Sequence, residues 1–404
     1  MNSDLVAVLD LGSTKVTCLA ASSEGKDGMT IHAIATAPCR GMKKGQVYDP
    51  GEVARAISKV VSAVESQVEE EIDGLVVGVT GTHIEGVNSQ GLKPIYPAGR
   101  KITHQDVLEV INHSREISLG DDREQIQALP REFRVDGERN VQKPIGRSGK
   151  RLEVFAYIVS GQSSSLQMIE QVVQDAGKQV EQMVIQSLAA GIGVLKPLAM
   201  EEGAAVVDIG GSTTDIAIFI NGSIAFSASV PLGGLSVTND LGTLLKTSPD
   251  EAEKLKIQSG SAIARMVDEK ESIEVMQLGQ PIGRPMSRRV LCEIIESRMR
   301  EIATLVGKEL DRSPFGTALP GGVTLTGGGA ALPGTVDLFN EVLPKFRFQG
   351  AEPNVGKKFT VGPGMATSVG LASFTIQCFD EFSPAEGTLP WRDRVKSLFS
   401  LLNK

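Results

Sequence analysis

Asp10-Leu11-Gly12-Ser13-Thr14-Lys15 lies near the start of the chain, and Asp208-Ile209-Gly210-Gly211-Ser212-Thr213-Thr214-Asp215 repeats its pattern in the second half. Apolar runs flank both copies: Leu5 to Leu9 and Val16 to Ala20 around the first, Ala204 to Val207 and Ile216 to Ile220 around the second. Each copy therefore predicts a tight turn between two buried strands. The repetition indicates a chain built from two similar halves.

The residue types in these turns suit a phosphate chain. Glycine permits positive φ and lets backbone N–H groups approach an anion, while Ser and Thr hydroxyls and a lysine add donors. The predicted phosphate ligands are Gly12, Ser13, Thr14, Lys15, Gly210, Gly211, Ser212, Thr213 and Thr214. A leading aspartate can hold Mg²⁺ through water, so Asp10 and Asp208 are the predicted metal residues. A single Asp-x-Gly turn is also ordinary turn chemistry, but two opposed copies could clamp a triphosphate.

Three further segments are rich in small residues. Gly327, Gly328 and Gly329 follow the apolar run Val323 to Leu325 and precede a helix-like stretch from Val336 to Leu343. Bare backbone at such a junction suits a base, a ribose or an α-phosphate, or else it allows close packing of helix on strand. Residues 184–191 and 363–372 read as small-residue helix starts, where two helices could cross closely at a hinge or simply pack together.

The order of these segments is similar to that of the actin-like ATPase superfamily, which includes actin, the rod-shape protein MreB, the 70-kDa heat-shock chaperones and sugar kinases. The likeness covers most of the chain, and within the superfamily the sequence resembles FtsA, a family of bacterial cell-division proteins. The resemblance implies an α/β fold: an actin-like duplicated ATPase fold with an inserted small α+β subdomain and a C-terminal amphipathic helix. It also implies ATP and Mg²⁺ as ligands.

Residues 83–165 carry much of the resemblance to FtsA, in the segments 83–91, 102–107, 129–137 and 140–154. From the residues alone, the stretch reads as a small α+β unit. A helix is expected from Asp106 to Ile117, and strands from Glu132 to Val135 and from Leu152 to Val159. Because no nucleophile or metal cluster is visible, the unit is expected to contact other division proteins rather than to do chemistry.

The end of the chain changes character after Phe379, where the composition reads as a tether. Beyond it, apolar residues recur at helical spacing on one face: Trp391, Val395, Leu398, Phe399 and Leu402. Arg392, Arg394, Lys396 and Lys404 make the segment cationic, although the chain carries a net charge of −8. Such a helix suits an anionic membrane surface. The alternatives are a helix packed on its own domain or one that binds a partner.

Composition limits the function classes. A chain of 404 residues, 41% hydrophobic, can bury a large core and should form two or more domains. Its acidic balance and 4% aromatic content argue against nucleic acid as a partner. The four cysteines are scattered and the histidines show no metal spacing, which is typical of reduced thiols in a cytosolic protein. No signal-like or membrane-spanning segment is evident, so the protein is expected on the cytoplasmic side. The resemblance to FtsA implies, more narrowly, the cytoplasmic face of the cell membrane at the division site.

The segment after Pro231-Leu232-Gly233-Gly234 supplies the expected adenosine contacts. Ser248 reads as the cap of a helix that holds Glu253 and Lys256. In actin-like proteins the matching helix touches ribose and adenine, so Gly234, Glu253 and Lys256 are carried over as ligands; a solvated charge pair explains the spacing equally well. In FtsA-like proteins this quarter receives the tail of FtsZ, the bacterial tubulin homologue. Arg288, Arg289, Arg298 and Arg300 are candidate acceptors, unless they only form a solvated helix face.

Hydrolysis needs a group that orients the attacking water. Where MreB proteins use a glutamate, this chain has Gln186, with Thr213 or Thr214 as helpers. An amide can orient water but is a poor base. Any turnover is therefore expected to be slow, and ATP is expected to act chiefly in domain closure and self-association.

The resemblance implies a division of the chain into units: residues 1–82 with 166–202 and residues 203–240 with 313–378 as the two core subdomains, 83–165 as the insert, 241–312 as the outer subdomain, 379–390 as a linker and 391–404 as the membrane helix. The expected function is a membrane adaptor that binds ATP, forms filaments and tethers FtsZ. A PilM-like scaffold of a pilus-assembly system is the main alternative. A small-molecule kinase lacks a candidate base here, and a chaperone would need a further domain.

Overall fold

The computed structural model describes residues 5–24, 28–141, 143–316, 319–353, 355, 359 and 361–382, and of residues 378–382 only the backbone. Helix α10 (Ala366–Phe382) includes the first four residues of the predicted linker. The rest of the linker and the predicted membrane residues Trp391, Val395, Leu398, Phe399 and Leu402 lie outside the described residues.

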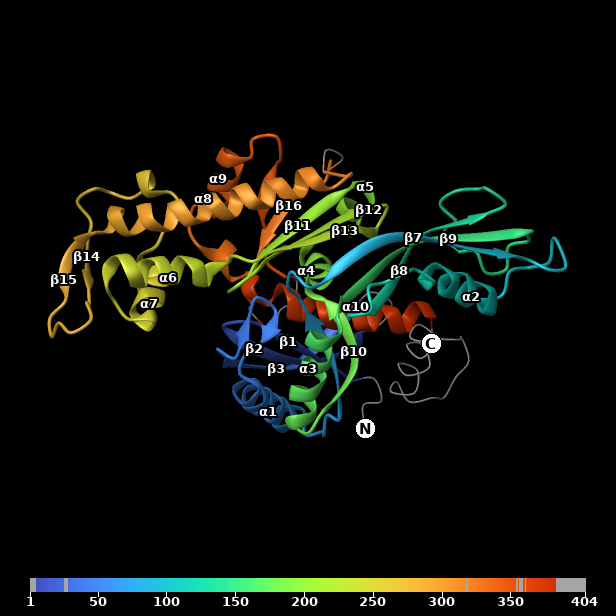
Figure 1. Cartoon of the computed structure of the whole chain (residues 1–404), viewed down its shortest axis with the longest axis horizontal. Helices are drawn as coiled ribbons and strands as arrows, with labels where there is room; N and C mark the ends of the chain where they lie inside the picture. The colour runs from blue at the N-terminus through green and yellow to red at the C-terminus, as the bar shows by residue number, and fades with distance from the viewer. Residues whose placement is uncertain are drawn as a thin grey trace.

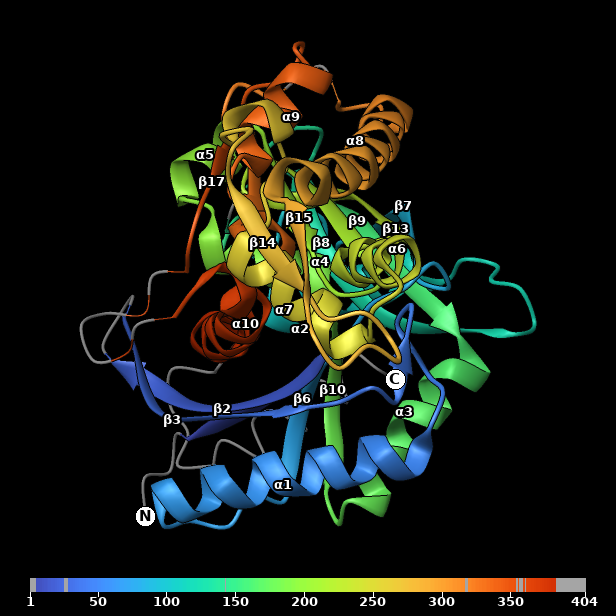
Figure 2. The ribbon, with the colours of Figure 1, turned by 90° about the vertical axis from the view of Figure 1, so that its left-hand side faces the viewer.

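The first core sheet has five strands in the order β10-β6-β1-β2-β3. Their bounds are β1 (Val6–Leu11), β2 (Lys15–Glu24), β3 (Gly28–Pro38), β6 (Gly74–Val79) and β10 (Gln179–Ile185). β1 pairs antiparallel with β2 and parallel with β6. Helices α1 (Pro50–Val68) and α3 (Ser163–Asp175) lie on its outer side, as Figure 2 shows.

The second core sheet repeats this order as β17-β16-β11-β12-β13. Its strands are β11 (Ala204–Ile209), β12 (Thr214–Ile220), β13 (Ser223–Val230), β16 (Val323–Thr326) and β17 (Phe348–Gly350). β11 pairs antiparallel with β12 and parallel with β16, so β1 and β11 are equivalent strands. The predicted duplication and the predicted strands beside both turns are confirmed.

Two helices lie between the sheets, α4 (Gln186–Val194) and α10 (Figure 1). They cross so closely that a Cβ at Gly370 would lie 1.7 Å from the carbonyl oxygen of Ala189. A Cβ at Gly193 would lie 2.3 Å from that of Ala366. The predicted close crossing of two small-residue helices is therefore confirmed, and their N-termini both reach the centre of the molecule.

The insert extends to the right in Figure 1 as a three-stranded sheet with one helix. It comprises β7 (Glu85–Pro94), α2 (His104–Arg115), β8 (Arg123–Val135) and β9 (Arg151–Gln162). α2 begins two residues earlier than expected because Thr103 caps it in a capping box with Asp106. The insert also rests on the second core, where Ser227 N donates to Tyr157 Oη over 2.7 Å.

The outer subdomain, at the left of Figure 1, follows β13. It contains α6 (Gly234–Leu245), α7 (Pro249–Ser259), β14 (Ser272–Val275), β15 (Arg284–Ser287) and the long α8 (Arg288–Arg312). Ser248 accepts a hydrogen bond from Glu251 N over 3.2 Å, which confirms the predicted helix start. The remaining elements are β4 (Met42–Lys43), β5 (Gln46–Val47), α5 (Pro197–Glu202), α9 (Thr335–Val342) and three short 3₁₀ turns at 264–266, 328–331 and 363–365.

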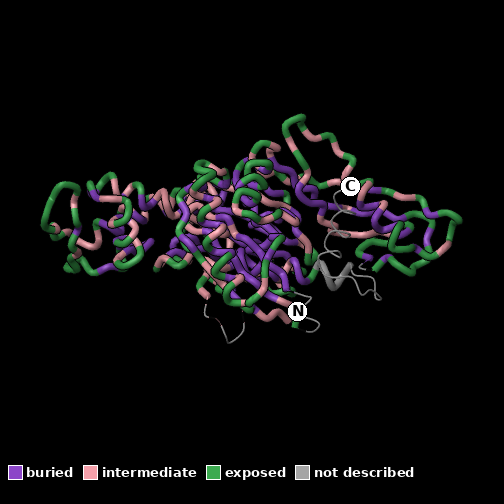
Figure 3. Tube along the Cα trace, turned by 90° about the horizontal axis from the view of Figure 1, so that it is seen from below, coloured by how far each residue is buried: buried purple, intermediate pink, exposed green. Residues whose placement is uncertain are grey.

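Burial is concentrated where the two sheets meet the central helices, and the insert has a smaller core of its own (Figure 3). The insert core joins Ile102, Val110 and Ile111 to Leu152 and Val154 of β9. Within the described ranges, no helix has the length and apolar character needed to cross a bilayer.

Candidate functional site

The two Asp-x-Gly turns, at residues 10–15 and 208–215, have the same backbone hydrogen bond. Gly12 N donates to Lys15 O over 3.1 Å, and Gly210 N donates to Thr213 O over 2.9 Å. The strand registers also match: Asp10 lies opposite Thr17, and Asp208 lies opposite Asp215. The turns meet face to face, where the hydroxyls of Ser13 and Ser212 contact each other.

A pocket of about 310 Å³ lies between the turns and collects most of the predicted ligands. Of the predicted residues, it is lined by Asp10, Gly12, Ser13, Thr14, Lys15, Gln186, Asp208, Gly210, Gly211, Thr213, Gly234, Glu253, Lys256, Gly327, Gly328 and Gly329. Residues that are far apart in sequence and come from both halves thus share one cavity.

Two predicted ligands are directed elsewhere. Thr214 is fully buried, does not line the pocket, and donates to Leu232 O over 2.9 Å. Ser212 accepts a hydrogen bond from Lys44 N over 2.8 Å and contacts Ser13. Both hydroxyls are therefore hydrogen-bonded to other segments of the chain.

Three aspartates line the pocket: Asp10, Asp208 and Asp215. Burial raises the pKa of each of them, and it raises that of Asp208 to about 7. The positive charge of Lys15 acts in the opposite direction on Asp10 and Asp208. A cation bound beside these carboxylates would offset the desolvation of their charged forms.

The N-termini of α4 and α10 hold the two leading aspartates. Gln186 Nε2 donates to Asp10 Oδ1 over 3.0 Å, and its other acceptors are the carbonyl oxygens of Leu11 and Gly78. On α10, Thr367 Oγ1 donates to Asp208 Oδ2 over 2.8 Å, and Ser368 Oγ to Asp10 Oδ2 over 3.2 Å. Helix N-termini favour nearby negative charge, so both carboxylates sit where anions are stabilised.

Lys15 and Lys256 both bring a positive charge to the pocket. Lys256 is paired with Glu253 at 2.7 Å, whereas the ammonium of Lys15 contacts Met365 Sδ at 3.6 Å. A lysine in this position suits a phosphate oxygen.

Gly327 closes the pocket beneath Asp208. It has φ of +86°, and a Cβ there would lie 2.1 Å from Asp208 Oδ1. Only glycine fits this backbone conformation and this distance. The glycine at position 327 is therefore required for steric reasons, in addition to its place in the pocket wall.

The far wall of the pocket belongs to the outer subdomain. Lys256 Nζ donates to Glu253 Oε2 over 2.7 Å and to Gly234 O over 3.1 Å. The hydroxyl of Thr238 donates to Glu253 Oε2 and accepts a hydrogen bond from Lys256 Nζ over 3.0 Å. The Glu253–Lys256 ion pair thus exists, and both residues also line the cavity.

Sequence reasoning missed Thr80, Thr367 and Ser368, and it gave Asp215 no role. Thr80 follows β6, and its Oγ1 donates to Asp215 Oδ1 over 2.6 Å. One signal was available: the carboxyl ends of the parallel strands β6 and β1 lie at the same edge of the sheet, so a polar residue after β6 must lie near the first turn.

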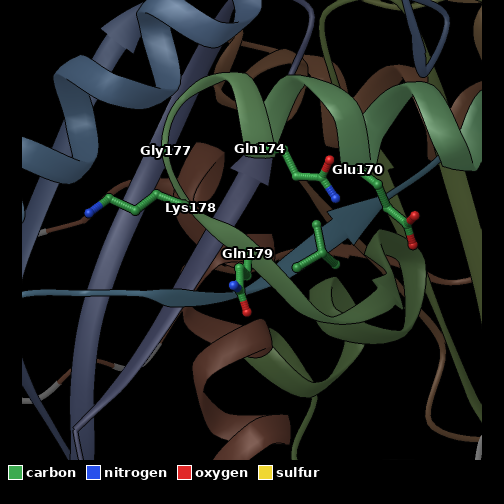
Figure 4. Close-up of a pocket in the computed structure, with 6 residues that line it drawn as sticks. Glu170, Gln174, Gly177, Lys178 and Gln179 are labelled. Carbon is green, nitrogen blue, oxygen red and sulfur yellow. The ribbon is translucent and has the colours of Figure 1, made fainter.

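Within the described ranges, no group of three or more His, Cys, Asp or Glu side chains is arranged to bind a metal ion. A second hollow, of about 500 Å³, lies between α3 and β10 (Figure 4). It is lined by Glu170, Gln174, Gly177, Lys178, Gln179 and Val180, none of which is a predicted site residue. Lys178 pairs with Glu65 at 2.8 Å.

The four arginines proposed to accept an acidic peptide all hold carboxylates already. Arg288 pairs with Glu271 at 2.5 Å, Arg298 with Asp240 at 2.7 Å, and Arg300 with Glu341 at 2.6 Å. Arg289 pairs with Glu269. An incoming acidic peptide would therefore exchange partners with these carboxylates.

Comparison with known families gives two matches. The family model for the cell division protein FtsA matches residues 205–370, and the model for the SHS2 domain inserted in FtsA matches residues 81–160. Curated FtsA proteins align over nearly the whole chain. That of Pseudomonas aeruginosa is 32% identical over 92% of this chain and 89% of its own, and that of Bacillus subtilis is 32% identical over 93% and 84%.

Solved structures with the same fold are more distant in sequence. A PilM-PilN type IV pilus biogenesis complex gives a TM-score of 0.63 at 15% identity, covering 92% of this chain and 98% of its own. MreB5 of Spiroplasma citri bound to ADP gives 0.55 at 15% identity, covering 94% and 98%. These likenesses show an actin-like fold.

Proposed function

The chain belongs to the FtsA family of cell division proteins, and we propose that it binds ATP with Mg²⁺, assembles into actin-like filaments and ties FtsZ filaments to the cytoplasmic membrane. It would act as a peripheral adaptor at the division site, helping to build the septum. The observation that carries the nucleotide part is that the pocket between the two turns is lined by Asp10, Asp208 and Lys15 together.

The donor set of the pocket suits a nucleoside triphosphate. Lys15 and the two turns line the space proposed for the phosphates, while Gly234, Glu253 and Lys256 form the wall proposed for ribose and adenine. The related fold of MreB5 was crystallised with ADP. A pocket that draws its lining from both halves would be closed by the ligand that fills it.

The metal proposal rests on Asp10 and Asp208. Both residues are partly buried, and both are held by hydrogen bonds from the start of α10. A bound Mg²⁺ would neutralise phosphate charge and polarise the terminal phosphate. The two aspartates would hold it through water, as an oxygen-lined site with few protein ligands does.

ATP hydrolysis, in this proposal, is slow. Gln186 lies at the pocket with its NH₂ group engaged by Asp10 and two carbonyl oxygens. An amide cannot remove a proton from water at neutral pH. The main use of the nucleotide would then be to hold the halves together for self-association.

Membrane binding is proposed for residues 391–404. Their apolar face would lie in the headgroup layer, and each Lys or Arg adds about 1 kcal/mol on an anionic surface. Docking of the acidic FtsZ tail is proposed for the outer subdomain around Arg288 and Arg289, where Glu271 and Glu269 would be displaced. The insert, which carries the SHS2 match, is proposed to contact other division proteins.

Co-sedimentation with anionic lipid vesicles tests the adaptor. The full chain should sediment with the vesicles, bring an FtsZ tail peptide with it, and do both more strongly when ATP·Mg²⁺ promotes assembly. Deleting residues 390–404 should abolish sedimentation while leaving peptide binding in solution. If the truncated chain sediments as well as the full chain, the membrane anchor is wrong and a PilM-like scaffold, which binds a membrane partner instead, becomes the better account.

A further inference from the structure

A buried carboxylate joins two threonine hydroxyls at the base of the pocket. Thr80 Oγ1 donates to Asp215 Oδ1 over 2.6 Å, and Thr213 Oγ1 donates to Asp215 Oδ2 over 3.1 Å. All three residues line the nucleotide pocket. Thr80 comes from the first half of the chain, and Thr213 and Asp215 come from the second.

The direction of these hydrogen bonds determines what the hydroxyls offer to a ligand. A threonine hydroxyl has one proton and two lone pairs. Since both protons are donated to Asp215, Thr80 and Thr213 present only lone pairs to the cavity. Phosphate oxygens are acceptors too, so these hydroxyls are poor phosphate ligands. A water molecule, in contrast, has two protons and can donate one to each hydroxyl.

Gln186, the residue first expected to orient water, is less suited to that role. Its NH₂ group points at Asp10, Leu11 O and Gly78 O, and it therefore holds the first turn in place. Thr80 and Thr213 differ from Thr367, which donates to Asp208, in that both of their hydroxyls are oriented by the same carboxylate, that of Asp215.

The internal duplication argues that the arrangement is not needed for folding. By strand register, Asp215 is equivalent to Thr17, and Thr213 is equivalent to Lys15. The first half thus builds the same turn without a carboxylate at this position: Thr17 is buried, and its hydroxyl is hydrogen-bonded to that of Thr36 over 3.3 Å. The first turn carries Lys15, and the second carries Asp215 and Thr213.

We propose that Thr80 and Thr213 bind and orient the water that attacks the terminal phosphate of a bound nucleoside triphosphate, and that Asp215 positions both hydroxyls. This rests on the proposed ATP binding. The water oxygen forms a bond to the terminal phosphorus, the bond from that phosphorus to the bridging oxygen breaks, and the nucleoside diphosphate leaves with the electron pair. The water proton ends on the released phosphate. Because the site takes residues from both halves, it is complete only when the pocket is closed at its base.

The test uses the full-length protein and three variants: Thr80→Val, which keeps the shape and removes the hydroxyl, Thr80→Ser, which restores it, and Asp215→Asn. Calorimetry measures binding of ATP·Mg²⁺, of ADP and of ADP with aluminium fluoride, a mimic of the transition state. Single-turnover assays measure hydrolysis. Thr17→Val, at the equivalent strand position in the first half, is the matched control.

We expect Thr80→Val to bind ADP like the wild type, to hydrolyse ATP at least about tenfold more slowly, and to lose a similar factor in affinity for the aluminium fluoride complex. Thr80→Ser should recover most of both, and Asp215→Asn should resemble Thr80→Val. Thr17→Val should leave both readouts unchanged.

Wild-type turnover and wild-type affinity for the aluminium fluoride complex in folded Thr80→Val or in folded Asp215→Asn would overturn the inference. A wild type that binds ATP·Mg²⁺ without any turnover would overturn it as well. A wild type that does not bind ATP·Mg²⁺ would instead remove the proposed function, and the binding measurement separates the two failures.

Discussion

Thr367 Oγ1 donates to Asp208 Oδ2 over 2.8 Å, and this contact fixes the start of α10 against the second Asp-x-Gly turn. The neighbouring Ser368 makes the same kind of contact with Asp10 of the first turn. Two consecutive hydroxyls of one helix therefore bridge the equivalent aspartates of the two halves. The position of α10 between the sheets depends on the same carboxylates that are proposed to hold the metal.

The raised pKa of Asp208 predicts a pH-dependent stability in nucleotide-free protein. Its folded-state pKa of about 7 exceeds the ordinary value of 3.8, so the folded state keeps a proton that the unfolded state loses. Asp208 therefore costs no stability below about pH 4, an increasing amount up to about pH 7, and a constant amount above. Thermal unfolding of the wild type and of Asp208→Asn should show a difference that grows across this window. A difference independent of pH would contradict the burial of a titrating carboxylate.

Gly327→Ala should destabilise the protein by about 1–3 kcal/mol, because it combines a positive φ with a Cβ placed 2.1 Å from Asp208 Oδ1. It should also weaken ATP·Mg²⁺ binding by displacing that carboxylate. Gly328→Ala is the control for stability, since a Cβ there meets no atom within 4 Å. Denaturant unfolding of both variants provides the measurement, and equal stabilities would show that the turn does not have this geometry.

Local features of this fold could be predicted from the sequence, whereas contacts between distant segments could not. The two turns, their flanking strands and the cap at Ser248 were predictable because each depends on neighbouring residues. Which hydroxyl of Ser212, Thr213 and Thr214 faces the pocket was not, because small changes of backbone direction in the turn decide it. Thr80 and Thr367 reach Asp215 and Asp208 only through the packing of sheets and helices that are distant in sequence.

Gln186→Glu should reduce stability and should not raise turnover. Nε2 of Gln186 donates to Asp10, to Leu11 O and to Gly78 O, so a carboxylate oxygen in its place would face three acceptors. Leaving such groups unsatisfied costs about 1–3 kcal/mol. Urea unfolding and ATP turnover, measured together, test this. Faster hydrolysis at unchanged stability would indicate that Gln186 acts on water and not on the first turn.

Arg40 and Asp250 form an ion pair at 2.5 Å that joins the first core to the start of α7 in the outer subdomain. Both side chains are highly exposed, 74% and 79%, so the pair is weak, about 0–1 kcal/mol. Arg40→Glu should speed nucleotide release by about two- to fivefold at low salt, and the exchanged pair Arg40→Glu with Asp250→Arg should restore it. Stopped-flow release of a fluorescent ATP analogue measures this. Release from the exchanged pair as fast as from Arg40→Glu would rule out a contribution of this ion pair to nucleotide retention.

The central claim is that one nucleotide is held between the two turns by groups from both halves. Titration of the wild type and of Asp208→Ala with ATP·Mg²⁺ by calorimetry tests it most directly. The account predicts one site in the wild type, and no detectable binding in Asp208→Ala although the variant still unfolds cooperatively. Wild-type affinity in Asp208→Ala, or no binding by the wild type, would contradict it.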